Sequence, residues 1–528
     1  MPNQADATPI DGLRALPTAI GFMAMCVGMF MAILDVQVVA TALPTIQSAL
    51  TIAPSAMSWL QTAYLIAEVV AIPLTGLLTR ALSMRWLFVG AVSLFTLASI
   101  GCAASAGFAS LVAWRIVQGF AGGTLIPSVF AAVFVLFPVR QQALATTLAG
   151  VLAVLAPTVG PVVGGWITQT YSWHWLFLIN VLPGVAAAVC ASLMLPRGSA
   201  NLTSLARLDA GALALLAVAL ASLEIGLKQA PQSGWGSLTV LGLLAASVAS
   251  LAALVRRTLA GPSPLIDFAI LRDRSFAIGC LLSFVLGIGL FGTIYLMPVF
   301  LALVRGEDPL EIGKIMLVTG VAQLLTAPVA IALERRIDGR ILTVFGFLVF
   351  GLGLSMSTGQ DGATDYDEMF WPQVVRGSAI MFCLLPPTRL ALGHIPLARV
   401  PDASGLFNLM RNLGGAVGLA LIDSVIYGRV EPIARGIRQS LLAGDAAVAV
   451  RIGIPLTRFL NRGTAPLDAE TQAAVAHLVE RAALIGAINE AWMLIALLTL
   501  IALVAVPFAG APARPDLPAP GEVWPSTG

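Results

Sequence analysis

Long apolar runs, separated by short polar segments, repeat along almost the whole chain. A helix needs about 20 mostly apolar residues to cross the hydrocarbon core of a bilayer. The pattern therefore predicts an all-α polytopic membrane protein with fourteen transmembrane helices. The predicted helices span residues 17–42, 56–78, 84–105, 108–132, 142–168, 174–195, 208–228, 237–256, 275–303, 310–333, 340–357, 369–392, 402–428 and 482–509.

Arginine residues predict how these helices are oriented, because short cytoplasmic loops carry an excess of positive charge. Basic residues such as Arg140, Arg257 and Arg336 fall in alternate loops, which we place in the cytoplasm. An even number of spans then puts both ends of the chain in the cytoplasm as well. Thirteen predicted spans precede the segment 429–481, so it is placed on the non-cytoplasmic side of the membrane, although it is rich in arginine.

The outer segment 429–481 contains a run, 468–483, that is typical of an amphipathic helix. Ala474, His477, Leu478 and Arg481 would share one side of that helix through their i, i+3, i+4, i+7 spacing. Two interpretations remain open. The segment either folds over the outer mouth or binds a partner such as a periplasmic adaptor protein, or it is a mobile linker.

The order of the predicted helices suggests two similar halves of six, with two further helices inserted between them. Arg115 lies about seven residues into the fourth helix, and Arg376 about seven residues into the twelfth. Paired halves are typical of transporters, whose substrate site lies near the bilayer midplane between them. The predicted domains are a cytoplasmic N-terminus (1–16), a first six-helix bundle (17–195), an inserted two-helix hairpin (196–260), a second six-helix bundle (261–509, with the outer segment 429–481) and a cytoplasmic tail (510–528).

Composition excludes several classes of protein. Hydrophobic residues make up 58% of the chain and charged residues 11%, against roughly 25% charged residues in ordinary soluble domains. The five cysteines are isolated and the three histidines far apart, so neither a disulfide framework nor a metal site is expected. There is no phosphate-binding GxxxxGK[ST] motif. We therefore expect no cofactor, no nucleic-acid partner and no enzymatic activity; a membrane-embedded enzyme or sensor is the non-transport alternative.

Charged residues within the predicted helices need a reason, because each costs about 2.5–3.5 kcal/mol at the centre of a membrane helix. Asp35 in the first helix and Arg115 in the fourth are expected at similar depth, on the outer side. An ion pair or a shared water network between them would handle protons or substrate. The alternative interpretation is a structural ion pair that only fixes packing.

Two further charges lie deep in predicted helices. Glu68, near the midplane among apolar neighbours, is a candidate proton site or a contact for a cationic substrate. It is alternatively a protonated glutamate that is hydrogen-bonded between helices. Arg411 would pair with an acid across the cavity or coordinate backbone at a helix break.

Small residues and prolines concentrate in the fifth predicted helix. Gly160 and Gly164 lie four residues apart, which lets another helix approach closely. Prolines within a helix commonly bend it. The segment is a candidate gate between the two sides of the membrane, with ordinary helix packing as the alternative. Its residues are Pro157, Gly160, Pro161, Gly164 and Gly165.

Four of these stretches together resemble the major facilitator superfamily, and within it the fourteen-helix drug:proton antiporter branch (EmrB/QacA type). They are LDVQVVATALPTI (34–46), WRIVQGFAGG (114–123), APTVGPVVGGWI (156–167) and SWHWLFLINVLPG (172–184). The resemblance implies a bacterial inner-membrane exporter of hydrophobic or cationic small molecules (multidrug efflux), which exchanges them for protons by alternating access. It places Asp35, Arg115 and Gln118 among the coupling residues. A narrow exporter of one metabolite, siderophore or antibiotic remains the alternative.

The loop after the second predicted helix departs from the superfamily pattern. GLLTRALSMR (76–85) keeps Gly76 and Arg85, but Arg80 stands where the family has an acid and Ser83 where it has a second glycine. The family's stabilising interaction of that acid cannot form here in the usual way. The resemblance implies a gating role for Gly76, Arg80 and Arg85. The departure weakens this implied role more than it weakens the resemblance to the family.

Overall fold

The computed structural model describes residues 12–53, 56–57, 59–72, 74–198, 209–260, 268–334, 336–393, 395, 400–460 and 469–509. These residues form helices and their connections, and no strand occurs among them. The predicted all-α fold class is thus confirmed for the part of the chain that is described.

The helices of the first half and of the inserted hairpin follow the predicted stretches closely. They are α1 (Gly12–Ala49), α2 (Trp59–Ala71), α3 (Leu74–Leu82), α4 (Met84–Ala103), α5 (Phe108–Leu136), α6 (Val139–Thr170), α7 (Trp175–Leu178), α8 (Val181–Met194), α9 (Ala210–Ser233) and α10 (Leu238–Ala260). Two predicted spans are each built from two helices: α2 and α3 form the second span, and α7 and α8 form the sixth.

The second half contains longer helices. They are α11 (Arg274–Phe300), α12 (Pro309–Glu334), α13 (Gly339–Ser355), α14 (Tyr366–Leu392), α15 (Val400–Leu442), α16 (Ala446–Arg451), α17 (Leu456–Leu460) and α18 (Ala469–Ile501), with short turns η3 (Phe268–Arg272), η4 (Leu301–Arg305) and η6 (Ala502–Phe508). Eleven of the described helices are long and apolar enough to cross a membrane, and α2 and α13 are shorter apolar helices. Every one of the fourteen predicted stretches overlaps a helix, but length and hydropathy alone support eleven crossings.

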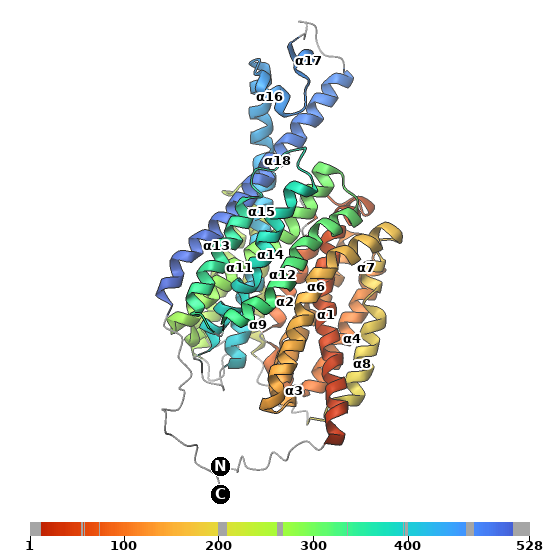
Figure 1. Cartoon of the computed structure of the whole chain (residues 1–528), viewed down its shortest axis with the longest axis vertical. Coiled ribbons are helices and arrows are strands. Elements are labelled where there is room, and N and C mark those ends of the chain that lie inside the picture. Colours follow the sequence, from red (N-terminus) through yellow and green to blue (C-terminus); the bar gives the residue numbers. More distant parts are fainter. Residues whose placement is uncertain are drawn as a thin grey trace.

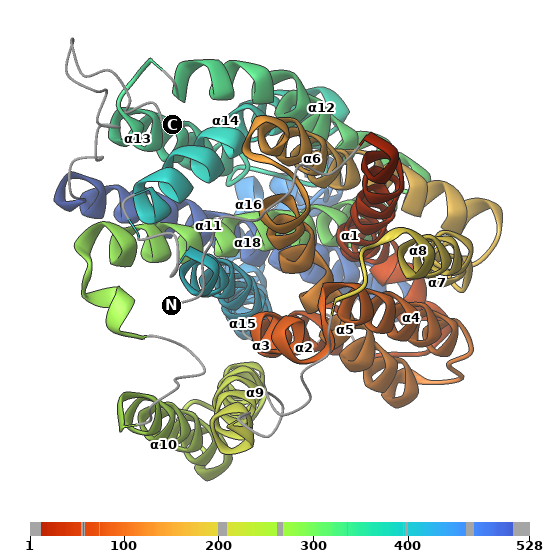
Figure 2. The same ribbon diagram turned by 90° about the horizontal axis from the view of Figure 1, so that it is seen from below.

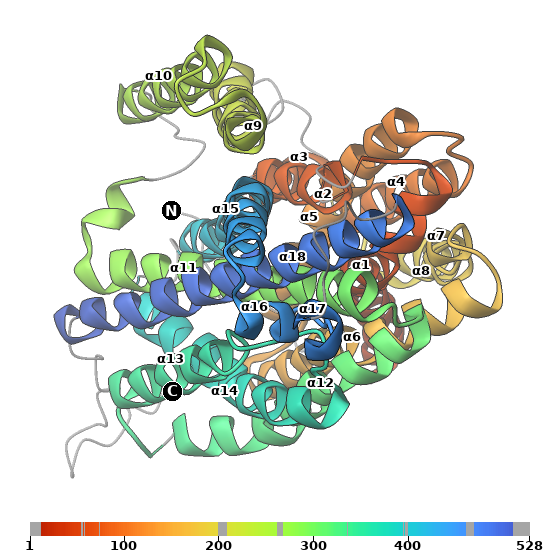
Figure 3. The same ribbon diagram turned by 90° about the horizontal axis from the view of Figure 1, so that it is seen from above.

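The helices gather into two groups that follow the order of the sequence (Figures 1 and 2). One group contains α1 to α8, and the other contains α11 to α15 and α18. The groups meet mainly where α6 packs on α12, where α2 packs on α15 and where α1 touches α11. The hairpin of α9 and α10 stands to one side, with α9 against α2 and α15 (Figure 3).

The described residues of the outer segment 429–481 are largely helical, and the described part of the predicted amphipathic run lies in a helix. Helix α15 continues to Leu442, and α18 already begins at Ala469. Together with α16 and α17 they form an extension that lies beyond the bundles, at the end opposite to the start of α1 (Figure 1). The extension has an apolar core of its own, made by Ala434, Ile437, Leu441, Ala449, Ile452, Phe459, Val479 and Ala483.

The buried face of α18 in this extension is offset from the predicted one. Val479 and Ala483 are buried, whereas Ala474 and His477 are exposed. The helical period was predicted correctly, but the face that meets α15 is centred about one residue later. Because this core packs them together, the described residues of the segment form a helical extension.

Ser83, which stands between α3 and α4 at the family's second glycine position, has a left-handed backbone with φ 71° and ψ 155°. This region of conformational space is nearly reserved for glycine and costs other residues about 1–3 kcal/mol. The hydroxyl of Ser83 is also buried without a hydrogen-bond partner among the described residues. The departure from the family pattern therefore carries a local cost in stability.

We predict that Ser83→Gly stabilises the protein by about 1 kcal/mol, because glycine adopts this backbone conformation without steric strain. Thermal unfolding of the purified protein would measure the gain. Ser83→Ala is the matched control, since it removes the unpaired hydroxyl but keeps Cβ. Equal stabilisation by the two variants would contradict the backbone explanation.

Candidate functional site

Asp35 on α1 and Arg115 on α5 form a buried ion pair. Nη1 of Arg115 donates to Oδ2 of Asp35, and neither side chain is exposed to solvent. The similar depth predicted for the two residues is therefore observed. A pair sealed in this way is not screened by water, so each charge depends strongly on the other.

A hydrogen-bond network extends the pair to two further helices. Gln118 Nε2 donates to Asp35 Oδ1 at 2.9 Å and to Ser99 Oγ on α4 at 2.9 Å. Asn180 Nδ2, at the start of α8, also donates to Asp35 Oδ1 at 2.9 Å. Asn180 and Ser99 are as deeply buried as the charged pair. The carboxylate of Asp35 thereby joins α1, α5 and α8.

The guanidinium of Arg115 also contacts two residues of α2. Its Nε donates to the backbone oxygen of Leu60 at 3.0 Å, and its Cζ lies 4.3 Å from the ring centre of Tyr64. Gly119 allows this approach, because a Cβ there would lie 2.3 Å from the Tyr64 oxygen. The spacing of WRIVQGFAGG thus serves two purposes. Arg115 and Gln118 reach Asp35, and the glycines let the backbone of α2 pack closely against α5.

The glycines of α6 pack against two different partners. A Cβ at Gly160 would lie 2.5 Å from Cβ of Gln37, and one at Gly164 would lie 2.5 Å from Oγ1 of Thr41, both on α1. A Cβ at Gly165 would instead lie 2.0 Å from the backbone oxygen of Pro309 on α12. Helix α6 therefore fits closely into its own bundle and, through the next glycine, against the other bundle.

The contact between α6 and α12 continues along the helices. A Cβ at Gly313 would lie 2.3 Å from the Pro161 oxygen, and Thr158 Oγ1 donates to the Gly320 oxygen at 3.1 Å. Pro157 and Pro161 both lie inside α6, which is a continuous helix from Val139 to Thr170. This segment therefore forms a seam between the bundles in the observed state.

Glu68 and Arg411 lie near a second contact between the bundles. Glu68 on α2 is 5% exposed, and its carboxyl is hydrogen-bonded to the side chain of Asn412 on α15. Arg411 stacks on Phe407 of its own helix, with 5.7 Å between Cζ and the ring centre. Among the described residues Arg411 has no acidic partner, and α15 is unbroken around it. The structure therefore brings Glu68 to the interface but does not join it to Arg411.

The residues of the departing loop motif lie at the end of the first bundle where α3, α4 and α8 meet. Gly76 and Arg80 belong to α3, and the side chain of Arg80 is outside the described part. Arg85, in the first turn of α4, donates to the backbone oxygens of Ser192 and Leu195. A guanidinium is favourable there, because the C-terminal end of a helix carries partial negative charge. Arg85 thus fastens α4 to α8 within one bundle.

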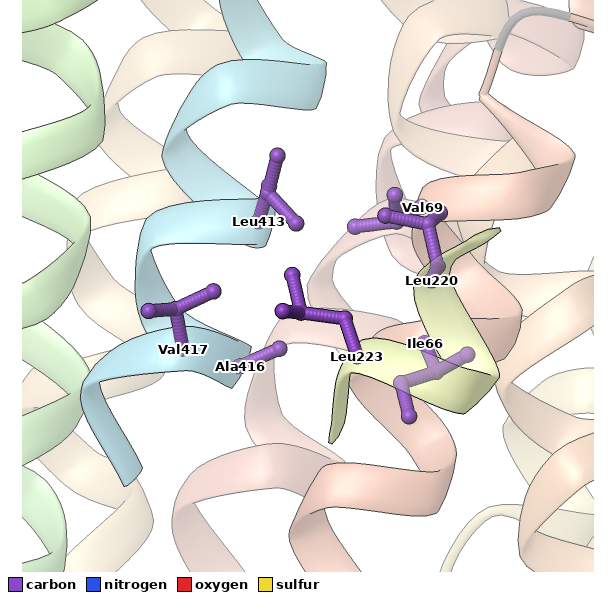
Figure 4. A pocket seen from close by; sticks show the side chains of 7 residues that line it. All are labelled: Ile66, Val69, Leu220, Leu223, Leu413, Ala416 and Val417. Carbon is purple, nitrogen blue, oxygen red and sulfur yellow. The ribbon is translucent and has the colours of Figure 1, made fainter. Parts of the chain in front are cut away.

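A small apolar hollow lies where α9 covers the contact between α2 and α15 (Figure 4). Ser424 Oγ on α15 also donates to the Leu227 oxygen of α9 at 3.1 Å. The inserted hairpin is therefore packed onto both bundles. The hollow is lined by Ile66, Val69, Leu220, Leu223, Leu413, Ala416 and Val417.

Comparison with known proteins agrees with this architecture. Residues 25–419 match the family model described as Major Facilitator Superfamily. The Colistin resistance protein EmrB of Acinetobacter baumannii is 38% identical over 76% of this chain and 79% of its own length. The Multidrug export protein EmrB of Escherichia coli K12 is 30% identical over 80% of this chain and 82% of its own length. The chain belongs to the major facilitator superfamily, in its EmrB-type branch.

Solved structures support the same fold. An inward-facing, unoccupied bacterial homologue of the human lysosomal transporter Spinster superposes with a TM-score of 0.60, covering 94% of this chain and 98% of its own, at 13% identity. Identity this low shows only that the fold is shared. The major facilitator fold predicted from the sequence is confirmed.

The structure places Ser99 and Asn180 in the network around Asp35, although the sequence alone predicts no role for either residue. Asn180 was part of a stretch that resembles the family, but nothing in one sequence shows where its side chain points. The available signal was a polar residue at the start of an apolar helix. In this superfamily member Asn180 is a positioning residue for the carboxylate.

We predict that Asn180→Ala lowers export by roughly tenfold, because a hydrogen bond to a charged group is worth about 1.5–3 kcal/mol. Export from energised vesicles would measure the loss. Ser105→Ala is the control, since that buried hydroxyl, just after α4, donates to the Gly101 oxygen in the last turn of α4 and not to the Asp35 network. An Asn180→Ala variant as active as the control would show that this hydrogen bond does not matter for transport.

Proposed function

We propose that this protein is a secondary active transporter that exports hydrophobic or cationic small molecules in exchange for protons, by alternating access. The observation that carries the proposal is the sealed network of Asp35, Arg115, Gln118 and Asn180. The names of the relatives, a multidrug export protein and a colistin resistance protein, agree with efflux. Substrate, protons and the lipid bilayer are then the partners of the chain.

The network gives a physical route to coupling. A charged Asp35 is held by Arg115, Gln118 and Asn180 and fixes α1 against α5 and α8. Protonation would remove the negative charge, and Arg115 would lose the partner that compensates its burial. The helices could then rearrange, so that binding or release of one proton favours one of two conformations.

Glu68 and Arg411 are proposed as the residues through which binding of the transported molecule affects this conformational change. Glu68 reaches Asn412 across the contact between the bundles, so a change in its charge would alter an inter-bundle hydrogen bond. A cationic substrate would be attracted by Glu68 in its charged form. Arg411 precedes Asn412 in α15 and carries a positive charge near the same contact between the bundles, where it stacks on Phe407.

The seam of Pro157, Gly160, Pro161, Gly164 and Gly165 is proposed as one gate. The contacts of Pro161 and Gly165 with α12 must separate when the bundles rock apart, and these contacts involve glycine instead of large interlocking side chains. Gly160 and Gly164 would keep α6 packed on α1 during this motion. Arg85, which fastens α4 to α8, supports a unit that moves as one body. Gly76 and Arg80 complete the proposed gating loop on the other side of the membrane.

We place the protein in a bacterial inner membrane with both termini in the cytoplasm. The extension built by α15, α16, α17 and α18 would then stand on the periplasmic side. It lies beyond the bundles and has its own core, which suits a surface for a periplasmic adaptor protein. The proposed division into six, two and six helices is compatible with this orientation, because an inserted pair of spans returns the chain to the same side of the membrane.

We predict that an imposed pH gradient drives transport in proteoliposomes, and that Asp35→Asn and Arg115→Ala each abolish it. Either change leaves one buried group of the pair uncompensated, which costs about 3–5 kcal/mol in the sealed state. Transport of a fluorescent dye against its gradient would measure the activity. Full activity after an uncoupler has collapsed both pH gradient and voltage would contradict proton coupling.

The matched control for these variants is Asp209→Asn. Asp209 also pairs with an arginine, Arg257, but the pair is exposed at the hairpin, and such pairs contribute only about 0–1 kcal/mol. Transport by this variant should equal that of the wild type. Because the buried variants lose stability, detergent-solubilised folded protein must be quantified for each.

We predict that Leu442→Cys, in a background without the five native cysteines, reacts with a membrane-impermeant thiol reagent in intact spheroplasts. Leu442 is 82% exposed at the end of α15. Labelling only after lysis would place the extension in the cytoplasm and reverse the proposed orientation.

A further inference from the structure

The second bundle repeats the buried arginine of the first bundle. Arg376 lies on α14, the fourth spanning helix of the second half, as Arg115 lies on the fourth of the first. Both side chains are 0% exposed. Each guanidinium stacks on an aromatic ring, with 4.3 Å to Tyr64 for Arg115 and 4.8 Å to Trp492 for Arg376. The two arginines therefore occupy similar surroundings.

The partners of the two arginines differ. Arg115 reaches Asp35, Gln118 and a backbone oxygen, and only its Nη2 lacks a partner. Arg376 donates from Nη1 to Ser357 Oγ at 2.8 Å, whereas its Nε and Nη2 have no partner. No acidic residue pairs with it among the described residues. Helix α11, which corresponds to the helix of Asp35, contains no Asp or Glu.

The groups left unpaired on this face of α14 are donors. Gln373 lies one turn before Arg376; its Oε1 accepts from Thr319 Oγ1 at 3.0 Å, but its Nε2 has no partner. Two amide oxygens of the same bundle, in Gln360 and Asn489, also lack partners. An amide oxygen carries no formal charge, so neither can neutralise a guanidinium.

Burial of a charge without a counter-charge is too costly to leave uncompensated. Arginine stays protonated in proteins, so it cannot escape the cost by losing a proton. A buried charge is normally paired with an opposite charge. Several free N–H groups around a positive centre are the donor set that binds carboxylate, phosphate or halide. The missing component is therefore an anion.

We propose that Arg376 forms the cationic wall of an anion-binding site inside the second bundle. The site takes a small anion from solution or the anionic group of a transported molecule. The first bundle needs no such ligand, because Asp35 supplies the negative charge from the chain itself. The inference goes beyond proton-coupled export and does not depend on it.

Thermal unfolding of the purified full-length protein in lipid nanodiscs tests the proposal without any transport. At constant ionic strength, replacing gluconate by chloride should raise the melting temperature by roughly 1–3 °C and then saturate, because a ligand stabilises the state that binds it. Arg376→Gln should lose this response. Decanoate, with decanol as its neutral control, probes the anionic group of a cargo molecule.

A second variant introduces a negatively charged side chain next to Arg376, in place of an anion from solution. Ser357→Asp places a carboxylate on the residue that Arg376 already contacts, so it should raise the melting temperature in gluconate and abolish the chloride response. Ser355→Asp is the matched control: the hydroxyl of Ser355, two residues earlier, donates to the Leu352 oxygen of its own helix. This control should respond to chloride like the wild type.

The outcomes separate the sources of the anion. A chloride response that depends on Arg376 identifies a solution anion, and a response to decanoate but not to decanol or chloride identifies an anionic cargo. The proposal is overturned if neither anion shifts the wild type, or if Arg376→Gln responds as the wild type does. Should that variant fail to fold, an undiminished chloride or decanoate response in Ser357→Asp would overturn the proposal as well.

Discussion

A charge that is removed from water must meet an opposite charge, and this constraint organises the first bundle. Asp35 and Arg115 satisfy it for each other, Gln118 and Asn180 donate to the second carboxylate oxygen of Asp35, and Gln118 also accepts from Nη1 of Arg115. Because these side chains come from α1, α5 and α8, the pair fixes the rotation of three helices about their axes. Tyr64 and Leu60 extend the same frame to α2.

The two bundles differ in how they compensate the charge of their buried arginine. The first is neutral at its buried centre, whereas the second retains the positive charge of Arg376 with a serine hydroxyl as its hydrogen-bond acceptor. Their interface also differs between its two sides. On the α6 side glycines bring backbones into contact with α12, and on the α2 side Glu68 meets Asn412 and α9 covers the contact. A rocking motion would therefore separate a close glycine seam on one side and polar and apolar side chains on the other.

The sequence predicted what depends on position along a helix axis and missed what depends on rotation about it. Counting residues at a fixed rise placed Asp35 and Arg115 at one depth, and the ion pair followed. The same arithmetic could not show that Asn180 turns toward Asp35, or that Arg411 stacks on Phe407. Hydropathy ended the predicted span at residue 428 but could not show that α15 continues as a helix to Leu442, because the continuation is polar and helical at once. Contacts such as α9 on α15 depend on tertiary packing, which a single sequence does not record.

The burial of the network has a consequence for how coupling must work. Asp35 is 1% exposed, and Arg115, Gln118 and Ser99 are 0% exposed, so a proton cannot reach the carboxylate in the observed conformation. Access requires that packed helices part, and α6 packs on both α1 and α12 through adjacent faces. Movement at the α6–α12 seam is therefore transmitted to the helix that carries Asp35. In the proposed mechanism, proton exchange at Asp35 would therefore require opening of the seam, because the carboxylate has no water path while the helices stay packed.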